Sequence, residues 1–124
     1  MPSALTATGF HDAVEYKVVT VTSLTTGTDV QKNVTGGPGK LFNVYIDGGS
    51  TTADFWVKIF DGANPTAGTD IPQIILKCVA RLTASYQIPY GIAFTELGFW
   101  ATASANQTNT SGLTGSASVT LTCS

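Results

Sequence analysis

The sequence carries little charge. Only 11% of its 124 residues are Asp, Glu, Lys or Arg, less than half of the usual fraction of about 25%. Six basic and eight acidic residues give a net charge of −2, and the isoelectric point is near 5.0. Nucleic-acid binding depends on a basic surface, so we expect no nucleic-acid partner.

Long apolar runs are also missing. No run approaches the roughly 18 residues that a membrane-spanning helix needs, so we expect no membrane partner. Residues 1–15 have neither a basic start nor an apolar core, which is unlike a secretory signal. They are mostly small and polar, with Phe10 and His11 near their end. We expect this stretch to form an extended arm outside the core, packed on its own domain or on a neighbour.

Histidine and cysteine are scarce. The single histidine, His11, is far in sequence from Cys78 and Cys123, so these residues cannot supply the four ligands of a structural zinc site. No Gly-x-Ser-x-Gly motif occurs, and a nucleophile would lack a neighbouring base. We therefore expect no enzyme activity, no catalytic residue, no metal and no cofactor. The two cysteines are expected as reduced, buried thiols, although spacing alone leaves a disulfide open.

Two stretches imitate ligand-binding motifs. Residues 36–40 are glycine-rich and end in lysine, but Leu41 follows where a phosphate loop needs Ser or Thr. Residues 61–64 contain Asp and Asn, but the spacing does not match an EF-hand loop. A calcium site built from separated loops stays open as a minor alternative.

The residues that are abundant favour β-structure. There are 20 Thr, 9 Ser and 13 Gly; Thr favours strands, whereas Gly and Ser mark turns. Turn residues recur about every ten positions, and no segment has helical periodicity. The runs between them predict strands at 16–22, 28–34, 40–46, 53–60, 71–79, 84–88, 92–95, 97–103 and 116–123. We expect an all-β antiparallel sandwich of jelly-roll type, with about eight strands over residues 16–124.

Alternating residues predict which side of each strand faces the core. The expected inward sets are Ala117, Val119, Leu121 and Cys123; Phe42, Val44 and Ile46; and Phe55, Val57 and Ile59. Residues 47–50 (DGGS) are typical of a tight hairpin turn, so strands 40–46 and 53–60 are expected to pair.

Large aromatic residues lie on the opposite, nominally polar sides of two strands. Trp56 and Phe60 share a side with Lys58, and Trp100 shares one with Thr102. Such residues anchor interfaces. The favoured alternative is that a bulge, sheet twist or covering loop buries each tryptophan.

The order of several segments resembles small β-sandwich virion proteins of tailed bacteriophages. The segments that carry the resemblance are 44–47 (VYID), 55–61 (FWVKIFD), 64–72 (NPTAGTDIP), 88–94 (IPYGIAF) and 97–101 (LGFWA). They cover somewhat less than half of the chain. The resemblance implies a structural role without catalysis, in a capsid decoration protein or in a tail or fibre component.

From this resemblance we expect a capsid decoration (cement) protein on the outside of the virion, assembled in the host cytoplasm. Its partners would be the major capsid protein and copies of itself, as a homotrimer. The candidate interface residues are Phe10, His11, Trp56, Phe60 and Trp100. One alternative is a tail, fibre or baseplate component of the same fold. Another is a carbohydrate-binding module, in which exposed aromatic rings would stack on sugars; a host glycan is the less favoured partner.

Overall fold

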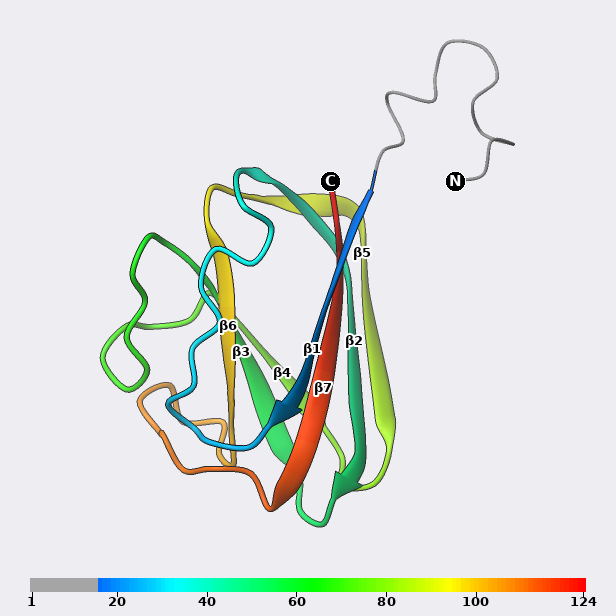
Figure 1. Cartoon of the computed structure of the whole chain (residues 1–124), viewed down its shortest axis with the longest axis vertical. Coiled ribbons are helices and arrows are strands. Elements are labelled where there is room, and N and C mark those ends of the chain that lie inside the picture. The colour runs from blue at the N-terminus through cyan, green and yellow to red at the C-terminus, as the bar shows by residue number, and fades with distance from the viewer. Residues whose placement is uncertain (1–15) are drawn as a thin grey trace, which may run out of the picture.

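The computed structural model describes residues 16–124, and their regular structure is entirely β (Figure 1). The strands are β1 (Lys17–Leu24), β2 (Gly39–Thr51), β3 (Phe55–Asp61), β4 (Ile74–Cys78), β5 (Thr83–Phe94), β6 (Leu97–Thr102) and β7 (Gly115–Cys123). No helix within this part of the chain is long and apolar enough to cross a membrane.

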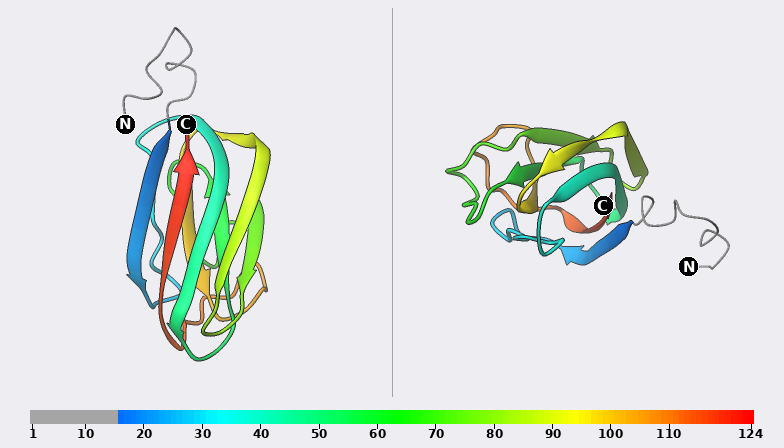
Figure 2. Two further views of the ribbon diagram at one scale, coloured as in Figure 1. Left: turned by 90° about the vertical axis from the view of Figure 1, so that its right-hand side faces the viewer. Right: turned by 90° about the horizontal axis from the view of Figure 1, so that it is seen from above.

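The seven strands form two sheets that face each other as a sandwich (Figure 2). The first sheet has the order β1-β7-β2-β5 and the second has the order β4-β3-β6. Every neighbouring pair is antiparallel. The predicted all-β antiparallel class is therefore confirmed.

Residues 16–124 form seven strands, close to the expected number of about eight, and the jelly-roll topology is not confirmed. Residues 28–34 are not a strand; they contribute only an isolated bridge between Gln31 and Phe99. The two runs predicted at 84–88 and 92–95 belong to one strand, β5, whose pairing with β2 is irregular between Gln87 and Ile92. Gly91 occupies the left-handed region at φ 75° and allows the strand to continue through this irregularity.

The hairpin predicted at residues 47–50 is wrong. These residues lie inside β2, which pairs with β5 and β7, whereas β3 belongs to the other sheet. Gly48 does not form a turn; its missing side chain allows neighbouring residues to pack closely against the backbone. A Cβ on it would lie 2.9 Å from the Leu82 carbonyl oxygen and 3.0 Å from Cys78 Sγ. The chain turns later, at residues 52–54, and passes from one sheet to the other.

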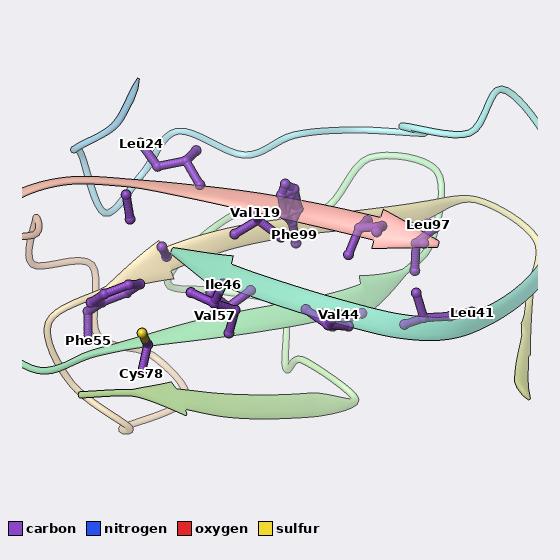
Figure 3. Packing of buried hydrophobic residues seen from close by; sticks show 14 of the residues in the cluster. Leu24, Leu41, Val44, Ile46, Phe55, Val57, Cys78, Leu97, Phe99 and Val119 are labelled. Carbon is purple, nitrogen blue, oxygen red and sulfur yellow. The ribbon is translucent and has the colours of Figure 1, made fainter. Parts of the chain in front are cut away.

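The core lies between the sheets, where side chains from both inner faces meet (Figure 3). On β7 the alternation holds, since Ala117, Val119, Leu121 and Cys123 are buried. On β3 the predicted inward residues Phe55, Val57 and Ile59 are also buried. Phe99 on β6 is fully buried among them and completes the contact between the layers.

The inward set predicted for β2 is partly wrong. Val44 and Ile46 are buried as expected, but Leu41 is buried in place of Phe42. The register of β2 against both neighbours shifts between Leu41 and Asn43. Such a bulge places one extra residue in the strand and reverses the alternation beyond it. Phe42 therefore lies partly outside the core, where its ring meets that of Tyr16 edge-on at 5.6 Å.

This bulge makes a prediction that distinguishes two adjacent residues. Leu41→Ala is expected to lower the free energy of unfolding by about 2–5 kcal/mol, because it opens a cavity in the core. Phe42→Ala is expected to cost less than about 1.5 kcal/mol, the scale of one aromatic pair. Urea unfolding followed by circular dichroism measures both. Equal losses, or a larger loss for Phe42→Ala, would contradict this placement of the bulge.

Candidate functional site

Trp100 is buried, so its prediction as an exposed interface residue is wrong. Its side chain on β6 has 0% of its surface exposed. It lies on the outer side of the three-stranded sheet, opposite Lys58 on β3 and near the Phe60 ring at 6.1 Å. The indole nitrogen has no hydrogen-bond partner. The favoured alternative, a tryptophan covered within its own domain, is the one that the structure supports.

Lys58 shows what covers this outer face. Its side chain is also 0% exposed, and its Nζ donates hydrogen bonds to the carbonyl oxygens of Asn106 (2.5 Å) and Asn109 (3.2 Å). Both residues belong to the loop between β6 and β7. Desolvation by burial lowers the pKa of the Lys58 ammonium. The loop therefore lies across the sheet and is held by a buried cation.

The covering loop has its own local order. Asn106 Oδ1 accepts hydrogen bonds from the backbone nitrogen and hydroxyl of Thr108, each at 3.0 Å. Asn109 Oδ1 accepts one from the Ser111 nitrogen at 3.0 Å. These side-chain turns present the two backbone carbonyls to Lys58.

Trp56 is half-buried and one face of its ring is occupied. Lys77 Nζ lies 5.7 Å from the ring centroid and 3.4 Å from an Asp54 carboxylate oxygen. A cation in this position is attracted to the ring face. A sugar stacking on Trp56 would have to displace Lys77. With Trp100 buried, both tryptophans are poor platforms for carbohydrate.

Phe60 is also half-buried and belongs to a small apolar cleft between the two sheets. The cleft has a volume of about 100 Å³. Its lining includes Leu41, Ile74, Ile92 and Phe94. Phe60 therefore borders this cleft, while its ring lies on the outer side of β3 near Trp100, and it forms no joint exposed patch with Trp56.

Phe10 and His11 lie outside the described residues, so their expected role stays a prediction. Of the three predicted interface residues that the structure describes, Phe60 and Trp100 lie together, Trp56 lies apart from them, and Trp100 is inaccessible.

The most exposed aromatic residues lie elsewhere, at one end of the four-stranded sheet. We define the aromatic end patch as Tyr16, Phe42, Pro89 and Tyr90. Tyr16 is 56% exposed and Tyr90 is 90% exposed. Tyr16, Phe42 and Pro89 line a groove of about 270 Å³. The patch thus extends from Tyr16, the first described residue, to the irregular part of β5 that contains Pro89 and Tyr90.

The sequence held a signal for this patch. Pro89 and Gly91 flank Tyr90, and a tyrosine between two turn residues is held away from a regular ladder. The structure places Phe42 next to this irregularity: a Cβ on Gly91 would lie 2.8 Å from the Phe42 ring. Tyr16 could not be assigned in advance, because its neighbour Phe42 was expected in the core.

The outer face of the four-stranded sheet is polar and almost uncharged. Across its middle, Thr20, Thr120, Tyr45 and Ser85 lie in one row of paired residues. The Thr20 and Thr120 hydroxyl oxygens are 3.1 Å apart. Such a surface can accept a neutral partner through hydrogen bonds, but it holds no reactive group.

Four of the described carboxylates, those of Asp47, Asp54, Asp61 and Asp70, accept hydrogen bonds from backbone nitrogens. Partial burial would raise the pKa of Asp61, but hydrogen bonds from the Glu96 and Thr95 backbone nitrogens and the Thr95 hydroxyl outweigh it and lower that pKa. This fastens the end of β3 to the turn between β5 and β6. The Ala80 nitrogen, with Lys77, lowers the pKa of Asp54. Within residues 16–124, no group of three or more His, Cys, Asp or Glu could hold a metal ion.

Comparison with protein-family models and with curated proteins gives no match to this chain.

The buried ammonium predicts a pH dependence. Between the lowered pKa of Lys58 in the folded chain and its ordinary pKa in the unfolded chain, only the unfolded chain is protonated, so stability rises with pH. The free energy of unfolding of the wild type, minus that of Lys58→Met, is expected to increase from pH 7 to pH 10. Subtracting the variant removes the contributions of the other titrating groups. Lys32→Met, at an exposed position, is the control for loss of one charge; parallel curves for wild type and Lys58→Met would contradict the prediction.

The cysteines are free and buried, as the sequence predicted. Desolvation raises the pKa of the Cys78 thiol and raises that of Cys123 to about 11. Because the thiolate is the reactive form, neither thiol should react with a chromogenic disulfide reagent at pH 8 in the folded protein. Both should react within minutes in concentrated urea. Rapid reaction of either cysteine without denaturant would contradict its burial.

Proposed function

We propose that this protein is a non-enzymatic virion component, a capsid decoration protein that binds the major capsid shell. The observation that carries the proposal is the aromatic end patch: Tyr16 and Tyr90 are exposed beside a groove, directly where residues 1–15 join the domain. An adhesive protein needs such a surface and needs no reactive site. The bacteriophage setting comes from the resemblance of segments such as 55–61 and 88–94 to virion proteins.

Interface chemistry supports the use of this patch. Tyrosine is enriched at interface centres because it buries a large ring while its hydroxyl keeps a polar partner. Tyr90 is 90% exposed and has room to lose surface on binding. The groove beside it, between Tyr16, Phe42 and Pro89, can receive a complementary side chain.

Other contacts in the domain hold parts of it rigid, which suits a structural protein. The outer face of the three-stranded sheet is closed by the loop that Lys58 holds, and Asp61 fixes the turn between β5 and β6. These contacts hold the β6–β7 loop and the β5–β6 turn in place, which limits the entropy that these two segments would lose on binding.

The sequence-level expectations of a shell location and a homotrimer remain part of the proposal. The proposal requires a stiff sandwich, and it does not depend on jelly-roll connectivity. A tail or baseplate location would use the same surface, and copy number in a purified particle separates the two: hundreds indicate the shell, a few dozen or fewer the tail. Trp100 is buried and Lys77 lies over the Trp56 ring, so neither ring is free to stack on a sugar. This counts against a carbohydrate-binding module.

The aromatic end patch gives the test. The double variant Tyr16→Ser and Tyr90→Ser is expected to weaken binding to purified shells that lack the protein by at least tenfold, because two anchors are removed. Co-sedimentation with such shells measures the affinity.

Leu82→Ser is the matched control, since Leu82 is also 56% exposed but lies at the other end of β5. It should bind like the wild type. Equal binding by the double variant and the wild type, with both folded, would remove the patch from the proposal. Absence of the protein from particles would overturn the proposed function itself.

A further inference from the structure

The first strand, β1, is hydrogen-bonded along one side only. It pairs with β7 from Lys17↔Cys123 to Val21↔Val119, and among residues 16–124 no strand pairs with its other side. The left view of Figure 2 shows β1 at the edge of its sheet. A strand of eight residues with an open side presents unpaired backbone donors and acceptors to another chain.

The other three outer strands are protected in ways that β1 is not. Backbone hydrogen bonds with Gln31 and Val34 cover β6. Pro89 and the irregular register interrupt β5. The strand β4 has only five residues and carries Lys77. These are the usual devices against edge pairing, and β1 has only Lys17, at its start.

The side chains of β1 are also incompletely covered. Val19 and Val21 point towards the core but are only half-buried, and Val18 on the other side is 66% exposed. A further strand alongside β1 would shield all three. The sequence 17–22 (KVVTVT) is rich in β-branched residues, which favours strand pairing.

We infer that the open side of β1 pairs with β1 of a second copy of this chain, antiparallel, about a two-fold axis at Thr20. This arrangement places Val19 opposite Val21 of the partner and Val18 opposite Thr22 of the partner. The half-buried valines then become cross-strand neighbours, which stabilise a sheet. Two four-stranded sheets become one eight-stranded sheet.

The positions of the two lysines favour the antiparallel orientation of a second copy over the parallel one. In an antiparallel pair the two Lys17 side chains lie at opposite ends of the ribbon, whereas a parallel pair would place them side by side. The backbone irregularity at Ser23, with φ 59°, ends the regular stretch and limits the pairing to about residues 17–22.

The inference does not depend on a virion role, because it uses only the strand edge. A contact of this length buries less than the standard interface of about 1,200–2,000 Å², so we expect a reversible, concentration-dependent dimer. A two-fold contact closes with two copies. It is therefore distinct from whatever contact would build a trimer.

Disulfide trapping tests the register. In Thr20→Cys the two new thiols would be directly opposite each other, within reach of a disulfide. Under mild oxidation at high protein concentration, most of this variant should run as a covalent dimer on a non-reducing gel. In Thr22→Cys the two thiols would be about 13 Å apart along the ribbon, so this matched control should remain monomeric. Adding Val18→Cys to Thr22→Cys should restore the covalent dimer, because it creates two opposite pairs.

Sedimentation velocity of the untreated wild type, over a wide concentration range, should show a reversible shift from monomer towards dimer. The inference is overturned if the wild type stays monomeric throughout. It is also overturned if Thr20→Cys and Thr22→Cys cross-link equally, or if a trimer forms without the Thr20→Cys cross-link. Loss of shell binding by the aromatic end patch variant would not affect any of these results.

Discussion

The β-bulge in β2 decides which of two adjacent side chains, Leu41 or Phe42, enters the core and which lies at the exposed aromatic end patch. β2 is hydrogen-bonded to β5 and β7, and its register against both shifts between Leu41 and Asn43. The shift turns Leu41 inward beside Val44 and leaves Phe42 at the margin, against Tyr16. A regular strand would bury Phe42 and leave Tyr16 without its neighbour. The packing of the core and the exposed Tyr16–Phe42 pair are therefore coupled at one backbone irregularity.

Much of the fold could be predicted because, in a strand with one buried face, apolar and polar residues alternate along the sequence. The pattern was sufficient for β7 and β3, whose inward residues are the predicted ones. It failed where the backbone departs from regular pleating, as at Phe42. Prediction also failed at Gly48 and Gly49, which lie inside β2 rather than in a turn; Gly48 makes room for the close approach of the Leu82 carbonyl. Whether a glycine bends the chain or makes room depends on distant residues, which local sequence does not specify.

The candidate site was harder to predict than the fold. By strand alternation, Trp100 and Lys58 lie on the outer side of the three-stranded sheet. They are buried because the loop that contains Asn106 and Asn109 covers this side. The loop is held by hydrogen bonds from Lys58 to backbone carbonyls. Because every residue has a backbone carbonyl, no sequence motif predicts this contact. Tyr90, by contrast, is exposed because its strand is interrupted beside it. Exposure in this domain follows loops and irregularities more than the chemical type of the side chain.

The pairing of β1 with β7 affects how the protein folds during its synthesis. The first described strand has only the last one as its partner, and β2 also needs β7 on one side. On the ribosome, which adds about 5–20 residues per second, β1 and one side of β2 cannot complete their pairing until β7 has emerged. Contacts so distant in sequence also make folding slow. Translation speed and the nascent-chain chaperones that shield waiting strands are thus expected to govern its yield in the cell.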